Sequence, residues 1–68
     1  MKNVYIKLII VGSRTIDSIP SKDLVAVAVG VIERGYDDGK EYATLDDVPE
    51  KHRQAVKDQL IEDGYITE

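Results

Sequence analysis

The stretch TIDSIPSKDLVAVAVGVIERGY, residues 15–36, decides how this sequence is interpreted, because the chain repeats it. Residues 44–65 read TLDDVPEKHRQAVKDQLIEDGY and align with it without a gap, 29 positions further on. Ten of the 22 aligned positions are identical, and three more are near matches: Ile16/Leu45, Ile19/Val48 and Val31/Leu60. Two copies of one pattern in a short chain indicate two copies of one local structure.

Each copy has residues that are typical of a turn followed by the start and the end of a helix. Thr15 opens the first copy, and its hydroxyl suits a turn that leads into a helix. Pro20 suits the first turn of that helix, where the missing N–H costs nothing. Gly35 is placed to end it as a left-handed cap. The aligned residues of the second copy predict the same start and stop, around a helix of about 13 to 15 residues.

A shorter echo extends the pattern to the start of the chain. LIIVGSRT, residues 8–15, matches LIEDGYIT, residues 60–67, at Leu, Ile, Gly and Thr. The match predicts that residues 8–11 end a helix and that Gly12 stops it. Two alternatives stay open: a strand over Val4–Ile10, favoured by its β-branched residues, and a phosphate-binding turn at residues 12–15.

The middle of the first copy alternates valine and alanine and, taken alone, resembles a strand. The second copy has strong helix formers there, with apolar residues at helical spacing. Because aligned copies should share a fold, both segments are predicted to be helical. The shared apolar positions are the expected core: Val27, Val56, Val31, Leu60, Ile32 and Ile61.

The sequence therefore predicts a mainly α protein with one small domain over residues 1–68. It would contain two helix-turn units, residues 15–36 and 44–65, with a 29-residue period. Between them, Asp38-Gly39 lies among tyrosines and marks a turn, with a short β-hairpin near Tyr36–Thr44 as one form of it.

The first unit carries apolar residues where the second is polar. Val25, Ala28 and Val29 align with Gln54, Lys57 and Asp58. A helix that is apolar nearly all round should be buried nearly all round. Either the segment Val4–Val11 covers this extra face, or another subunit does.

Ser13 and Arg14 have no aligned counterpart elsewhere in the chain, so any binding role of the turn at residues 12–15 would depend on them. With Val25, Ala28 and Val29 they form the candidate interaction surface predicted from the sequence.

Composition excludes several kinds of site. The chain has no cysteine and one histidine, His52, which argues against disulfides and thiolate or imidazole metal centres. No pattern of catalytic, cofactor-binding or metal-ligating residues emerges, so we expect no enzyme activity and no cofactor.

Charge and hydropathy narrow the partners further. The net charge of −4 is concentrated in the second half, which disfavours nucleic acid as a partner. No apolar run is long enough to cross a membrane, and no cleavable leader is expected.

Two further patterns carry a resemblance to a known group of proteins. In the first half, Tyr5, Leu8-Ile9, Gly12 and the Thr15-Ile16 turn are followed by Ile19-Pro20, a helix and a glycine. This order resembles the very short accessory proteins encoded in tail-module regions of phages and prophages of Gram-positive bacteria. The second half, YATLDDVPEKHRQAVKDQLIEDGYIT, resembles a helical motif found beside phage lysins.

The resemblance implies a non-enzymatic protein that binds itself or another phage or host protein. It would act in the cytoplasm of the bacterial host or within the virion. Two other classes remain as hypotheses: an acidic regulatory or inhibitor protein, and a nucleotide-binding fragment that uses the Gly-Ser-Arg-Thr turn.

Overall fold

The computed structural model describes residues 2–67 and contains three α-helices within them. They are α1 (Lys2–Ile10), α2 (Ser21–Asp38) and α3 (Glu50–Glu62). A 3-10 turn precedes each of the last two helices: η1 (Ile16–Ser18) and η2 (Leu45–Asp47). Since residues 2–67 include no strand, the prediction of a mainly α fold is confirmed and the β-hairpin near Tyr36–Thr44 is wrong.

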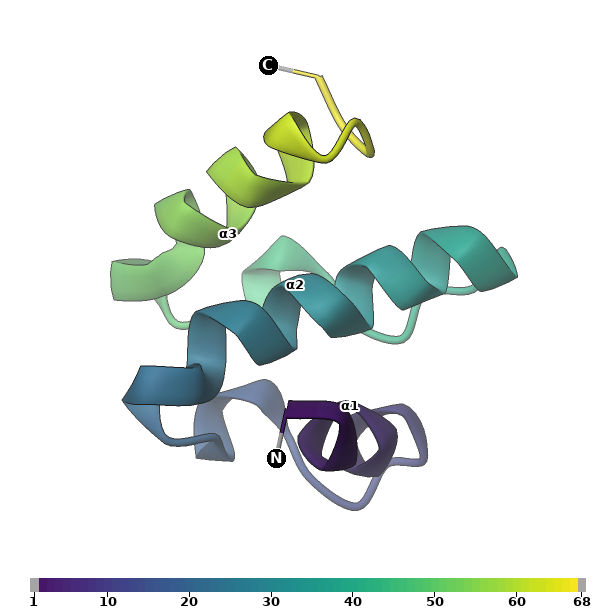
Figure 1. The fold of residues 1–68 in the computed structure, drawn as a ribbon. Helices are drawn as coiled ribbons and strands as arrows, with labels where there is room; N and C mark the ends of the chain where they lie inside the picture. The colour runs from purple at the N-terminus through teal and green to yellow at the C-terminus, as the bar shows by residue number, and fades with distance from the viewer. Residues whose placement is uncertain (1, 68) are drawn as a thin grey trace.

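α2 is the central element of the fold. α1 and α3 pack on opposite flanks of it, η1 packs near its start on the side of α1, and the segment with η2 passes behind it (Figure 1). The solvent-accessible surface is 4454 Å², close to the roughly 4,300 Å² expected for a compact protein of this mass. The chain therefore closes a core by itself.

That core is made of aliphatic side chains from the three helices, from η1 and from the residues just before the two prolines. The predicted positions Val27, Val31 and Val56 are fully buried, and Leu60 and Ile32 nearly so, whereas Ile61 is half-buried. Among the described residues no polar or charged residue is buried. Burial of these side chains supplies the main stabilising free energy.

The repeat predicted from the sequence is visible in the backbone before α2 and α3. Pro20 and Pro49 have φ of −53° and −52° and the same ψ of 139°. Each proline precedes the first helical residue, so the prediction that it lies within the first turn is off by one position. Its carbonyl accepts a hydrogen bond of 2.9 Å from Asp23 or His52, which starts the helix.

Glycines end all three helices in the left-handed region. Gly12, Gly39 and Gly64 have φ of 83°, 68° and 84°. In the first and last of these ends, the amide after the glycine donates to the carbonyl of Leu8 or Leu60, at 2.8 and 3.0 Å. These bonds are those of a Schellman motif. They confirm Gly12 as a helix stop and α1 as a helix rather than a strand.

Gly35 does not end α2, contrary to the prediction. The helix passes through it and stops at Gly39, one turn later. The chain then folds back over the helix, where the Lys40 amide donates to the Gly35 carbonyl at 2.8 Å. A Cβ at residue 35 would lie 2.6 Å from the Lys40 carbonyl oxygen. Gly35 is therefore required by close backbone approach and not by its dihedral angles.

Gly35→Ala is expected to lower the free energy of unfolding by about 1–3 kcal/mol, because the methyl group meets backbone that must shift. The loss should exceed the gain of about 1 kcal/mol that alanine brings to a helix interior. Chemical denaturation checks the value.

The aligned substitution Gly64→Ala provides the comparison. Nothing lies within 4 Å of its new methyl group, so its cost of about 1–2 kcal/mol comes from the left-handed backbone alone. An increase in stability in Gly35→Ala would contradict the close approach.

Candidate functional site

One side of α2 is left uncovered between α1 and α3, on the side that faces the viewer in Figure 1. It forms the floor of a shallow hollow of ≈ 490 Å³. We call the α2 residues of this floor the open face: Lys22, Val25, Ala26, Val29, Gly30 and Glu33. Lys2 of α1 borders the hollow on one side, and Gln59 of α3 and Asp63, the residue after α3, border it on the other.

The open face follows from helical spacing. Its members recur at intervals of three and four residues, which places them in one stripe along α2. The interior of the stripe is apolar, with Ala26 exposed and Val25 half-buried. A charged residue stands at each end, Lys22 at the start and Glu33 near the finish. The surface is thus an apolar strip between opposite charges.

The structure divides the predicted interaction residues among different environments. Ala28 is fully buried and Val29 is 7% exposed, so most of the extra apolar surface of α2 is used inside the chain. α1 packs on α2, with Ile6 against Gly30, in keeping with the alternative that the N-terminal segment covers part of this helix. Val25 lies on the open face, where its contact with a partner stays a prediction.

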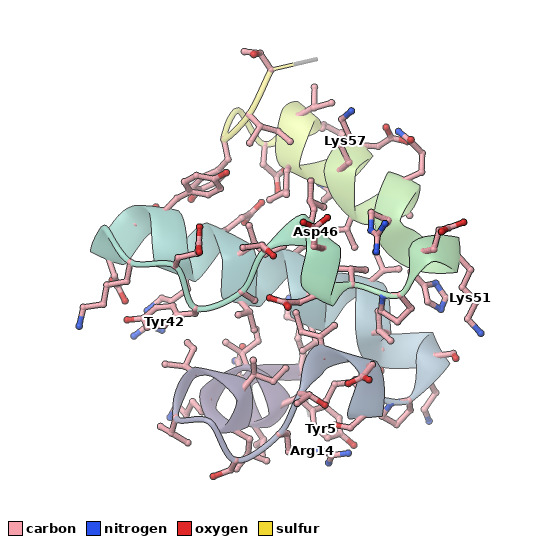
Figure 2. All side chains as sticks on the ribbon, turned by 180° about the vertical axis from the view of Figure 1, so that it is seen from behind. Tyr5, Arg14, Tyr42, Asp46, Lys51 and Lys57 are labelled. Atoms are coloured by element: carbon pink, nitrogen blue, oxygen red, sulfur yellow. The ribbon has the colours of Figure 1, made fainter. Side chains whose placement is uncertain are left out.

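Ser13 and Arg14 belong to another part of the surface. The Arg14 guanidinium lies 5.0 Å from the centre of the Tyr5 ring, and its Nη2 donates to the Ser18 carbonyl at 2.9 Å (Figure 2). Arg14 lines a separate hollow of ≈ 330 Å³ with Asp17 and other residues of the loops. Its side chain therefore ties η1 to α1.

The amides of the predicted phosphate turn are already in use. The N–H groups of Gly12, Ser13 and Arg14 donate to carbonyls of the last turn of α1, at 3.0, 2.8 and 3.3 Å. A phosphate-binding loop needs free amides that point at the anion. In this turn the three amides instead make the hydrogen bonds that end the helix.

Glu33 introduces an unusual charge at one end of the open face. Its Oε2 is shielded from solvent and has no hydrogen-bond partner. Burial, the close approach of the Asp63 carboxyl, and the negative charges of Asp63 and Asp37 raise the pKa of Glu33 to about 7, against a smaller opposing effect of Lys2. Three acidic side chains are thus crowded together beside the hollow.

Sequence reasoning missed Glu33, because its role depends on contact between the middle of α2 and the end of α3. The repeat made the role of Glu33 harder to recognise, because Glu33 aligns with Glu62, an exposed residue on the helix surface. No local pattern predicts which of the two aligned glutamates will lie against Asp63.

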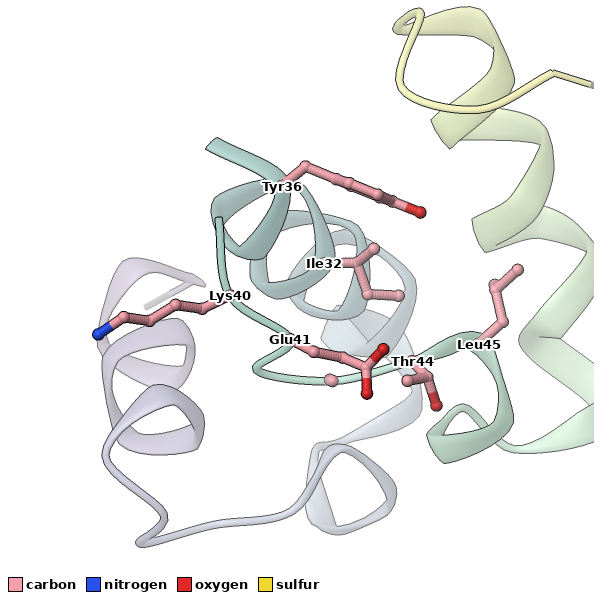
Figure 3. Close-up of a pocket in the computed structure, with 7 residues that line it drawn as sticks. Ile32, Tyr36, Lys40, Glu41, Thr44 and Leu45 are labelled. Carbon is pink, nitrogen blue, oxygen red and sulfur yellow. The ribbon is translucent and has the colours of Figure 1, made fainter. Parts of the chain in front are cut away.

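A further hollow of ≈ 260 Å³ lies between the end of α2 and the segment that leads to η2 (Figure 3). Ile32 and Leu45 contribute its apolar lining, and Tyr36 stands at its rim. The Tyr36 and Tyr65 rings lie 5.7 Å apart, and the Tyr65 hydroxyl donates to Asp37 at 3.0 Å, which raises the pKa of Tyr65. These contacts hold the C-terminal segment against α2.

Two kinds of site do not occur in the part of the chain that the structure describes. Residues 2–67 contain no group of three or more His, Cys, Asp or Glu side chains placed to hold a metal ion. No helix among these residues is both long and apolar enough to span a bilayer.

A comparison of the chain with protein families, with curated proteins and with solved structures gives no match in any of the three. The candidate site is therefore argued from its own geometry.

The crowded acids predict a pH-dependent stability. The Glu33 carboxyl ionises near pH 4.5 when unfolded and near pH 7 when folded, so the folded state binds the proton more tightly between these values. The contribution of Glu33 to the free energy of unfolding should be highest below pH 4.5 and should fall as the pH rises through 7.

Glu33→Gln should flatten this fall and raise the stability at pH 7.5, because the amide imitates the protonated acid. Asp63→Asn should also reduce the slope, since it removes a neighbouring charge. Urea midpoints at pH 4.5, 6 and 7.5 measure both effects. A steeper fall in Glu33→Gln would refute the assignment.

Arg14→Ala is expected to cost about 1 kcal/mol of stability, because it removes the contact with Tyr5 and the bond to Ser18. Arg34→Ala is the matched control: it breaks an ion pair to Asp38, but the Arg34 side chain is 58% exposed, so its loss should be below about 0.5 kcal/mol. Equal thermal midpoints in the two variants would show that Arg14 does not tie η1 to α1.

Proposed function

We propose that this chain is a non-enzymatic protein–protein interaction module that binds its partner through the open face of α2. The proposal takes the partner to be a second copy of the chain or another phage or host protein, as the resemblance to small phage accessory proteins implies. It places the protein in the cytoplasm of a bacterial host or in the virion.

The main support for this proposal is that one side of α2 has no other element of the chain packed over it. Three sides of the helix are packed by α1, by α3 and by the segments with η1 and η2 (Figures 1 and 2). The fourth side retains Val25, Ala26 and the edge of Val29 beside charged residues. An apolar strip with a polar rim is the usual composition of an interaction surface.

Nucleotide binding through residues 12–15 is the weaker candidate. The amides that would hold a phosphate end α1 instead, and Arg14 is engaged by Tyr5 and Ser18. Val25 and Ala26 of the open face, by contrast, keep surface open to the hollow.

The experiment is site-specific photo-cross-linking in cells that carry the gene. A photoreactive residue at position 25 of the open face should give discrete adducts on irradiation. The same residue at position 57, on the exposed side of α3 (Figure 2), should give few. Absence of adducts at 25, or equal yields at both positions, would contradict the proposal.

A further inference from the structure

We propose that the open face binds the open face of a second copy of this chain, with the two α2 helices antiparallel across a two-fold axis. This inference rests on the proposed function and names the partner for the same surface.

The order of residues along the open face is self-complementary. An antiparallel pairing about the midpoint between Val27 and Ala28 places Lys22 of one copy opposite Glu33 of the other. The same register places Val25 opposite Gly30 and Ala26 opposite Val29. A two-fold dimer requires this property, because one patch must fit itself after rotation.

Charge supplies the first physical argument. One end of the open face carries Lys22, and the other end carries Glu33 with Asp63 and Asp37 close by. Within the chain, Lys2 is the cation that acts on Glu33, and its effect is smaller than that of the crowded acids. In the antiparallel register, Lys22 of the second copy arrives at this acidic end. The pairing occurs twice, once at each end of the interface.

Packing supplies the second argument. The centre of the open face is built from Val25, Ala26, Val29 and Gly30, none larger than valine. Helices with such small residues at their contact can approach to about 8 Å between axes. At Gly30 the absence of a side chain lets Ile6 of α1 pack against the backbone, so this position presents no side chain of its own to a facing helix. The parallel arrangement would instead set Lys22 against Lys22 and the acidic ends against each other.

The need for a partner agrees with the size of the chain. Domains of this length are marginal in stability and often gain from oligomerisation. Here the monomer already closes its core, so association would add an interface rather than complete the fold. We therefore expect a dimer in equilibrium with a folded monomer.

A charge exchange tests the register directly. Lys22→Glu and Glu33→Lys each place like charges opposite one another in both symmetric pairs, so each variant alone should dimerise at least about tenfold more weakly than the unaltered chain. An equimolar mixture of the two variants restores both pairs, because the two substituted positions then face each other with opposite charges and the native pair forms at the other end. The mixture should therefore give a heterodimer of near-native affinity.

Sedimentation equilibrium up to 1 mM, with native mass spectrometry to identify the heterodimer, measures these affinities. Lys57→Glu and Asp46→Lys are matched controls with the same charge changes on exposed residues that lie on the opposite side of the molecule (Figure 2). Both controls should dimerise as the unaltered chain does.

Far-UV circular dichroism verifies that each variant folds. If a charge reversal unfolds the chain, Lys22→Gln and Glu33→Gln test the same pairs without reversal, and each should weaken the dimer by a smaller factor.

Two results would overturn the inference: a strict monomer at 1 mM, or a mixture that associates no better than the separate variants. Neither result bears on the proposed function by itself. Adducts between position 25 and a different protein would keep the interaction module and replace the second copy as its partner. Absence of any adduct would remove the proposed function as well.

Discussion

The fold depends on the packing of the buried side of α2 between α1 and α3. Val27 and Val31 of α2 are fully buried, and so are Val56 and Leu60 of α3. No disulfide or cluster of metal ligands reinforces the described residues, so dispersion and the hydrophobic effect must hold the helices together. Every other feature of the molecule, including the open face, exists because α2 is held in this central position.

The internal repeat made much of this arrangement predictable. The turn and the proline recur before α2 and α3, and the predicted glycine stop is found after α1 and α3. Such local patterns are what a sequence displays most directly. The comparison of residues 8–15 with 60–67 correctly assigned α1 to the helical class against its β-branched composition. The apolar core positions followed from the spacing shared by both units.

The failures concern aligned residues that have different neighbours. Gly35 and Gly64 are aligned and identical, yet one lies inside a helix and the other ends one. α2 continues past Gly35 to Gly39, and the Lys40 amide then bonds the Gly35 carbonyl in the same kind of helix end that Gly12 and Gly64 make. That stop is local, but the alignment of the two units pointed to Gly35 instead. Glu33 and Glu62 differ for a long-range reason, because Glu33 is approached by Asp63, which lies far along the chain.

The extra apolar residues of the first unit now have a physical explanation. α2 has neighbours on more sides than α3, so its sequence is apolar where α3 shows Gln54, Lys57 and Asp58 to solvent. Ala28 and most of Val29 are buried by this internal packing, whereas Val25, Ala26 and the exposed edge of Val29 border the hollow. The surface that we propose for interaction is therefore the part of a central helix that its own chain leaves uncovered.

Native-state amide hydrogen exchange tests the central position of α2 most directly. The account predicts that amides of Val27–Ile32 exchange only through global unfolding, with protection that matches the free energy from denaturation. Amides of α1 and of the last turn of α3 should exchange through smaller openings. If the amides of α2 exchanged faster than those of α1 or α3, the helix could not be the element on which the others depend.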